Sequence, residues 1–326
     1  MAVPKVAAIH DLSGLGKCSL TAAVPVLSAM GVQACPLPTA VLSNQTGFPS
    51  YACVDLSRHL DAFTREWEKH GVRFDGVYTG FLCGARQVRM VERFLDRFYL
   101  PGTLLLVDPV LGDNGKLYPV FGRTMCDSLK SLVARADVIT PNLTEACILA
   151  DGDYASVARA QSLEPVWELA ERLAGMGPRT VIVTGVHRGD LICNAGFDAR
   201  TGRRFSVGNR SVGSGRSFSG TGDLLASVLC GGLVRGETAV YAAVGLTGFA
   251  MACVFATFYA VATKAVPEKA NEVAGLMILA ISAGAVSGPV CGAIVRWSGD
   301  AHWGMLFVAL CVGYMLWASF KLKIKQ

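Results

Sequence analysis

Short apolar runs alternate with amphipathic segments of helical period over residues 3–236, and this alternation leaves few folds open to the chain. Thr103 to Val107 is typical of a buried strand, whereas Gln87 to Tyr99 repeats its apolar residues on one helical face. Strands that alternate with helices form a mostly parallel sheet, and the helices cover both of its faces. We therefore expect a three-layer α/β domain.

The same alternation gives approximate bounds for the expected elements. Strands are predicted at residues 3–9, 103–107, 137–140 and 180–184. Helices are predicted at residues 20–30, 87–99, 123–133, from 144 onwards and at 165–176. Pro25 is expected to kink the first of these helices.

Polar side chains follow directly after the predicted strands. They lie at His10-Asp11, Asp108 to Asp113, Thr140 to Glu145 and Thr184. Ligands of such sheets bind at the carboxyl ends of the strands. We therefore expect these polar segments to converge on one binding site.

The segment Ser219-Gly-Thr-Gly-Asp223 precedes a run that is typical of a helix. Its glycines allow close approach of the backbone to a ligand, and the N-terminus of the helix offers N–H groups to an anion such as phosphate. The carboxylate of Asp223 could take the proton from a hydroxyl group that attacks the phosphate. A glycine-rich turn with Asp223 as a helix cap explains the same residues equally well.

Two common nucleotide-binding motifs are missing. Gly16-Lys17 is followed by Cys18 and lacks the first glycine of a phosphate-binding P-loop, because Asp11 stands at that position. Gly213-Ser-Gly215 lacks the third glycine of a dinucleotide motif, because Phe218 occupies its place. Neither a P-loop nor dinucleotide binding is expected.

Charge and cysteine usage restrict the partners and the compartment. The net charge is +5 and the basic residues are scattered among acidic ones, so no nucleic-acid partner is expected. The 11 cysteines stand singly, without a C-x-x-C pair, as is typical of free thiols in a reducing cytosol. The first residues lack the pattern of a signal peptide, which predicts a cytoplasmic domain. His10, His59, His70 and His187 are expected on surfaces or loops, without a catalytic role.

Six ordered segments resemble those of pyridoxal kinases in the ribokinase-like family. They are Asp11 to Leu20, Pro36 to Thr46, Tyr78 to Phe81, Asp108 to Asp113, Thr140 to Glu145 and Gly220 to Asp223. The resemblance covers residues 1–236 and implies a ribokinase-like fold with a mostly parallel central sheet. It also implies ATP-dependent phosphorylation of the 5′-hydroxymethyl group of pyridoxal, pyridoxine or pyridoxamine. The hydroxymethylpyrimidine kinases, to which the segments are less similar, are a lesser alternative.

The resemblance also implies roles for individual residues. Asp223 would be the catalytic base, and Gly220, Thr221 and Gly222 the anion hole. The substrate ring would meet Asp11, Thr46 and Phe81, and ATP would meet Asp108, Thr140, Glu145 and Thr184. Mg²⁺ would lie near Asp113, Asn142 and Glu145, with water between; a K⁺ ion and a homodimer are further expectations. Each polar segment has a simpler explanation: a turn at Asp113, a helix start at Asn142, or a solvated strand end at Asp108.

The amino-acid composition becomes much more hydrophobic after Glu237. Residues 238–263 and 273–295 carry no charged side chain, and residues 301–320 contain no Asp, Glu, Lys or Arg. Each run is near the roughly 20 residues that cross a bilayer. Residues 237–326 resemble the last three transmembrane helices of a major-facilitator sugar transporter, with small residues suited to helix packing in lipid. We therefore predict a second region of three hydrophobic helices, which would associate the chain with a membrane through residues 238–320 if they insert.

The two regions imply conflicting topologies. A cytoplasmic C-terminus suits Lys321, Lys323 and Lys325, but counting back three spans places the residue before Thr238 outside the cell, whereas a kinase needs ATP inside. The reading frame is therefore interpreted as an accidental fusion or as an unusual insertion. An alternative function is a catalytically impaired fusion, or a membrane protein that carries a kinase-like ligand-binding domain.

Overall fold

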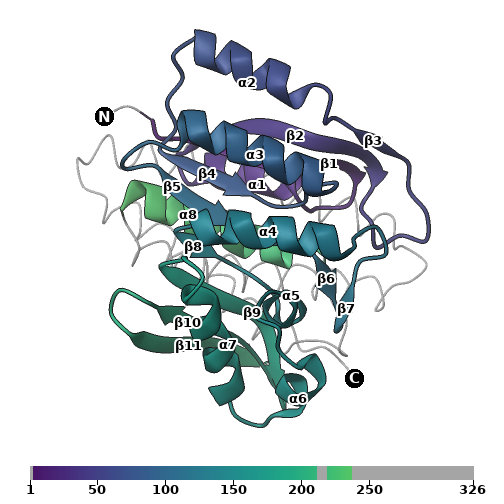
Figure 1. The fold of residues 1–326 in the computed structure, drawn as a ribbon, viewed down its shortest axis with the longest axis vertical. Coiled ribbons are helices and arrows are strands. Elements are labelled where there is room, and N and C mark those ends of the chain that lie inside the picture. Colours follow the sequence, from purple (N-terminus) through teal and green to yellow (C-terminus); the bar gives the residue numbers. More distant parts are fainter. Residues whose placement is uncertain (1–2, 211–218, 237–326) are drawn as a thin grey trace, which may run out of the picture. The chain divides into compact units, whose positions relative to one another are not determined.

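The computed structural model describes residues 3–210 and 219–236, which form a nine-stranded sheet with helices on both faces (Figure 1). The strand order is β11-β10-β9-β8-β5-β4-β1-β2-β3. The strands are β1 (Lys5–Leu15), β2 (Gln33–Asn44), β3 (Cys53–Asp55), β4 (Gly76–Thr79), β5 (Leu104–Val107), β8 (Val138–Ile139), β9 (Thr180–Arg188), β10 (Leu191–Asp198) and β11 (Arg203–Arg210). The six central strands β2, β1, β4, β5, β8 and β9 pair in parallel. At one edge β3 pairs antiparallel with β2, and at the other edge β10 and β11 continue the sheet in antiparallel pairing.

Eight helices and a small hairpin complete the part of the chain that the structure describes. The helices are α1 (Leu20–Ala29), α2 (Leu60–Lys69), α3 (Ala85–Phe98), α4 (Arg123–Arg135), α5 (Leu143–Leu149), α6 (Tyr154–Arg159), α7 (Glu164–Ala174) and α8 (Thr221–Arg235). The hairpin pairs β6 (Gly112–Asp113) with β7 (Lys116–Leu117). Its turn places Asn114 and Gly115 at positive φ, so the turn expected at Asp113 is present.

The sheet separates two apolar cores because successive side chains of a strand point to opposite faces. On one face Ile9, Val77 and Val107 pack with α3, α4 and α7. On the other face Val6 and Tyr78 pack with α1 and α8, which lie behind the sheet in Figure 1. This arrangement confirms the predicted three-layer α/β domain with a mostly parallel sheet.

The predicted elements agree with the structure within a few residues, with one clear exception. Strand β1 does not end at Ile9 but continues to Leu15, because it keeps pairing with β2 as far as Asn44. The register shifts between His10 and Leu12. Such a bulge changes the direction of side chains, and here both His10 and the adjacent Asp11 are buried. Helix α1 continues through Pro25.

The hydrophobic tail predicted for residues 237–326 lies outside the described residues. Its three helices and its membrane association therefore stay predictions. In residues 3–210 and 219–236, we find no helix whose length and apolar character would let it cross a bilayer.

The Gln87 side chain on α3 joins three separate segments of the chain. Its side-chain N–H groups donate to the carbonyl of Thr39 (2.8 Å), to Asp55 (2.9 Å) and to Ser57 (3.0 Å). Its Oε1 accepts the N–H of Cys83 at 2.8 Å. The side chain is buried, so water cannot replace these partners if they are lost.

We expect Gln87→Met to lower the free energy of unfolding by about 2 kcal/mol, because the replacement keeps the volume but leaves buried polar groups unpaired. Urea unfolding followed by circular dichroism measures the change. Arg89→Met, at an exposed position of the same helix, is the matched control and should shift the midpoint little. Equal midpoints for the two variants would contradict this account of Gln87.

Candidate active site

Four acidic side chains gather at the carboxyl ends of the central strands. Asp11 lies at the bulge of β1, Asp108 follows β5, Glu145 lies in the first turn of α5 and Asp223 in the first turn of α8. Backbone hydrogen bonds align the strand ends: the Asp108 N–H donates to the carbonyl of Thr79 (2.8 Å), and the Thr140 N–H to that of Val107 (3.2 Å). The predicted convergence of the polar segments is therefore present for these residues.

Burial and nearby negative charge make Asp108, Glu145 and Asp223 unfavourable to ionise. Burial, and then the negative charges of Glu145 and Asp223, raise the pKa of Asp108 well above its usual value. Burial also raises the pKa of Glu145, although backbone N–H groups oppose that effect. Asp108 is only 9% exposed, so it is not a solvated strand end. A cation bound nearby would relieve the repulsion.

Asp223 keeps part of its side chain accessible, with 15% of it exposed. Its Oδ2 accepts the N–H of Ser19 at 2.9 Å, a contact between residues 204 positions apart in the sequence. Burial raises the pKa of Asp223 to about 6, and the charge of Asp11 adds to the effect. The carboxylate does not cap α8, because Gly220 is the N-cap residue. The alternative interpretation of Asp223 as a helix cap is wrong.

Helix α8 begins without a side-chain cap. Gly220 adopts a left-handed conformation with φ of 87°, and a Cβ there would collide with the carbonyl of Lys17. Among the residues that the structure describes, no heavy atom lies within 4 Å of a Cβ placed at Gly222. The chain therefore approaches Lys17 closely at Gly220 and leaves open space at Gly222, beside the first-turn N–H groups and the positive end of the helix dipole.

Asn142 and Glu145 fix each other at the start of α5. The Asn142 Oδ1 accepts the Glu145 N–H at 2.9 Å, while Glu145 Oε2 accepts the Asn142 N–H at 2.8 Å. Glu145 Oε1 also accepts the N–H of Leu111 at 3.1 Å, and Asn142 Nδ2 donates to the carbonyl of Gly112 at 2.8 Å. The interpretation of Asn142 as a helix start is therefore correct. It is compatible with a polar site because the N–H groups of Asn142, Leu111 and Gly112 leave part of the Glu145 carboxylate's acceptor capacity open.

The remaining predicted residues lie around this centre. Thr140 is buried beside Asp108, and Thr184 pairs with Asn142 through a β-bridge. Asp113 is exposed on the hairpin and accepts bonds from its neighbour Asn114. The charge of Asp113 raises the pKa of the buried Glu145, although the Asp113 side chain itself is exposed on the hairpin.

Thr46 and Phe81 lie on the side of Asp11. Thr46 is exposed in the turn after β2, whose Gln45 accepts a hydrogen bond from Ser219 at 3.4 Å. Phe81 is half-buried against Phe121, with ring centroids 5.8 Å apart. Thr46 and Phe81 come from separate segments of the described part of the chain, and their shared role is a proposal.

His10 was missed by the sequence analysis. The prediction that it lies on a surface or loop is wrong, because its side chain is completely buried. Its Nδ1 lies 3.9 Å from Asp223 Oδ1, and its ring meets Tyr78 edge-on at 4.3 Å. One sequence signal for its burial was available, because His10 directly follows an apolar run. The pairing of β1 with β2 extends the strand beyond this run and so buries His10. His59, His70 and His187 are exposed as expected.

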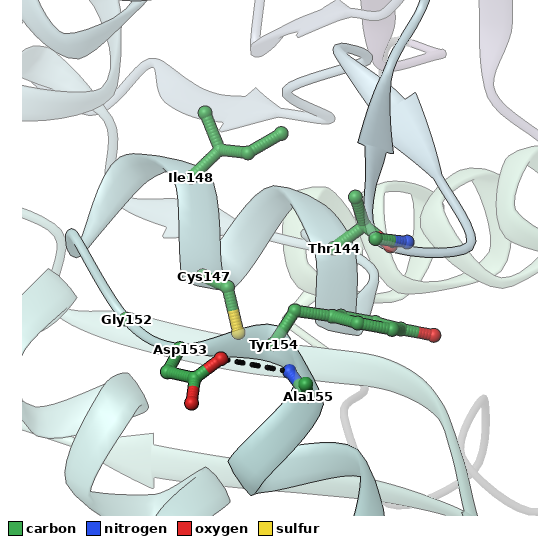
Figure 2. Close-up of a pocket in the computed structure, with 8 residues that line it drawn as sticks. Thr144, Cys147, Ile148, Gly152, Asp153, Tyr154 and Ala155 are labelled. Carbon is green, nitrogen blue, oxygen red and sulfur yellow. Dashed lines mark hydrogen bonds between the residues drawn. The ribbon is translucent and has the colours of Figure 1, made fainter.

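Across residues 3–210 and 219–236, no three His, Cys, Asp or Glu side chains form a ready-made metal centre. A hollow of about 360 Å³ lies elsewhere, between α5, α6 and the tip of the hairpin (Figure 2). It is lined by Gly115, Thr144, Cys147, Ile148, Gly152, Asp153, Tyr154 and Ala155. None of the four clustered carboxyl residues lines it, so the hollow is not the site described above.

Comparisons with known proteins agree with this arrangement. The model of the phosphomethylpyrimidine kinase family matches residues 19–260. A pyridoxal kinase from Pseudomonas putida is 31% identical over 55% of this chain, and the match spans 62% of that protein's length.

Solved structures give the same picture. A putative phosphomethylpyrimidine kinase from Bacteroides thetaiotaomicron has a TM-score of 0.71 and 39% identity, covering 77% of this chain and 87% of that one. Its second crystal form, with pyridoxal, has a TM-score of 0.68 and 40% identity, covering 72% and 82%. A pyridoxal kinase from Lactobacillus plantarum has a TM-score of 0.67 and 29% identity, covering 85% and 98%. These similarities confirm the ribokinase-like fold that the six sequence segments indicate.

We expect Gly220→Ala to destabilise the protein by about 2 kcal/mol, because alanine resists the left-handed conformation and its Cβ would collide with Lys17. Thermal unfolding of the full chain measures the loss. Gly222→Ala is the matched control two residues away, where the new Cβ meets open space, and its unfolding temperature should stay close to the original. A smaller loss for Gly220→Ala than for Gly222→Ala would refute the close approach to Lys17.

Proposed function

The chain belongs to the phosphomethylpyrimidine kinase family, and on that basis we propose that it transfers the terminal phosphoryl group of ATP to the 5′-hydroxymethyl group of a B6 vitamer. The observation that carries the proposal is the position of Asp223. Its partly accessible carboxylate stands in the first turn of a helix with no side-chain cap, beside the buried carboxyl group of Asp108.

Asp223 supplies the general base in this proposal. The Ser19 N–H holds Oδ2, which leaves Oδ1 to accept the proton of the substrate hydroxyl as its oxygen attacks phosphorus. The first-turn N–H groups of α8, from Thr221 and Gly222, would donate to the phosphoryl oxygens as charge develops there. One helix end thereby places the base and the anion donors side by side.

The buried carboxyls fit a magnesium ion that enters with the nucleotide. Burial raises the pKa of both Asp108 and Glu145, and the charge of Glu145 raises that of Asp108 further, so a bound cation would be stabilised there. Mg²⁺ supplies charge neutralisation at the phosphates and commonly keeps several water ligands. Since Glu145 and Asn142 already use their side chains in the capping contacts, they and the exposed Asp113 would hold the ion through water.

The substrate ring would lie between Asp11 and Phe81, with Thr46 approaching from the turn after β2. Thr184 and Thr140 would border the nucleotide, because they flank Asn142 and Asp108 respectively. Burial gives Asp11 few water contacts, so a polar ring substituent would be its natural partner.

The pyridoxal-bound form of the Bacteroides protein, at 40% identity, supports a B6 vitamer as substrate. The family name favours a second candidate, a hydroxymethylpyrimidine, which carries the same primary alcohol on another six-membered ring. Comparing kcat/KM for pyridoxal, pyridoxine, pyridoxamine and hydroxymethylpyrimidine with the full chain decides between them. The K⁺ ion, the homodimer, the impaired fusion and the membrane attachment of residues 238–320 stay predictions from the sequence.

We expect Asp223→Asn to reduce pyridoxal phosphorylation by about 10³-fold while the full chain stays folded, because the amide cannot accept the hydroxyl proton. A coupled assay of ADP release measures it. Asp190→Asn, at an exposed turn between β9 and β10, is the control and should keep full activity. Activity of Asp223→Asn equal to that of the control would remove Asp223 from the proposed role.

The pH dependence of kcat should report the same carboxyl group. Burial raises the pKa of Asp223 to about 6, and only the ionised form can act as a base. Activity is therefore expected to be full above this pKa and to fall as the pH drops through about 6. A rate that stays constant down to about pH 4.5, which is still above the ordinary aspartate pKa of about 3.9, would argue against a raised pKa.

A further inference from the structure

His10 presents an unusual buried polar group next to the proposed base. The side chain is completely buried, and neither ring nitrogen has a hydrogen-bond partner within the described part of the chain. An unpartnered buried N–H is unfavourable, so a partner reached by a small movement would stabilise the protein.

The imidazole is neutral in this environment. Burial lowers the pKa of His10 to about 3, because the charged form would lose its hydration. A neutral ring carries one N–H donor and one acceptor nitrogen. His10 therefore cannot neutralise a carboxylate by charge, but it can donate one hydrogen bond.

Titratable groups from several elements surround the pair of His10 and Asp223. Tyr78 on β4 and Asp223 on α8 lie against His10 itself. The charge of Asp223 also interacts with Asp11 on β1, Cys18 before α1 and Asp108 after β5. Asp11 already accepts a bond from Ser13 at 2.8 Å. Among the described residues, the acidic group within 4 Å of a His10 nitrogen is Asp223, whose Oδ1 is 3.9 Å from Nδ1.

Room for the ring in this position comes from Gly80. A Cβ at Gly80 would collide with the His10 imidazole, so the β4 strand end is shaped around the ring. Tyr78 holds the ring from the same strand by an edge-on contact. The ring is therefore fixed, and the Asp223 side chain is the partner that can close the remaining gap.

We propose that His10 is a positioning residue for Asp223: when nucleotide binds, Asp223 Oδ1 closes onto the Nδ1–H of His10. This inference rests on the proposed function, because it assumes an anionic phosphate beside Asp223. The negative charge of that phosphate favours protonation of a nearby carboxylate, which would disable the base. A hydrogen bond donated to the ionised form opposes that effect. With Ser19 on Oδ2 and His10 on Oδ1, the carboxylate would stay ionised and keep one orientation.

The test compares pH profiles of kcat for full-length His10→Leu, His10→Gln and Thr79→Val. We expect His10→Leu to move the acid limb upward by about one to two pH units and to lower kcat at pH 7 by about two- to tenfold. His10→Gln, which keeps an N–H donor, should restore most of both. Thr79→Val removes a hydroxyl that is equally buried on the same row of strand ends and should leave the limb in place. An unmoved limb in His10→Leu overturns the proposal even if its kcat is low.

A second measurement uses the unaltered full chain, in case His10→Leu fails to fold. The ¹⁵N spectrum of labelled histidine distinguishes protonation at Nδ1 from protonation at Nε2, with and without the unreactive analogue adenylyl imidodiphosphate and Mg²⁺. A proton on Nδ1 in the presence of the analogue supports the contact, and a proton on Nε2 overturns it. Absence of vitamer phosphorylation by the unaltered chain would instead defeat the proposed function, while the spectrum still decides the role of His10.

Discussion

The grouping of acidic side chains at one end of a parallel sheet is the constraint on which the site depends. Asp11, Asp108, Glu145 and Asp223 come from four elements that the fold brings to the same row of strand ends. Burial, and then the negative charge of neighbouring carboxylates, raise the pKa values of Asp108, Glu145 and Asp223. Such an arrangement costs stability in the empty protein and favours ligands that bring positive charge. The positive end of α8 offsets part of this cost at Asp223.

The contacts that hold the fold and those that prepare the site are largely the same contacts. Glu145 stabilises the start of α5 through the capping box, and its other oxygen fixes the segment at Leu111. Asp223 ties the first turn of α8 to the backbone before α1, through Ser19. A carboxylate held by backbone N–H groups loses little freedom when a ligand arrives, so the site is preorganised by its structural role. Substitutions at these residues will therefore change stability and chemistry together.

The sequence predicted the layers of the fold and most of the carboxyl cluster, because hydrophobic period and strand-end position are local signals. Asp108 and Glu145 follow predicted strands, and Asp223 follows a glycine-rich turn. His10 was misplaced since its burial depends on the pairing of β1 with β2, a contact between distant segments. The cap of α8 at Gly220 was also out of reach, because only the approach to Lys17 reveals why glycine is needed. The roles expected for Thr46 and Phe81 come from the family resemblance alone, because no local pattern in the sequence indicates where these two side chains lie.

Helix α8 ends at Gly236 for a local reason that is independent of any domain boundary. Gly236 adopts the left-handed conformation with φ of 71°, and its N–H donates to the carbonyls of Gly232 and Leu233. This is the usual way in which glycine ends a helix, so α8 stops there for a backbone reason. The family model nevertheless matches as far as residue 260, beyond the predicted boundary at 236. A helix end does not require a domain end. The segment that matches the family therefore includes most of the first uncharged run, residues 238–263. The uncharged composition of that run is therefore compatible with a continuing kinase domain as well as with the predicted membrane helix.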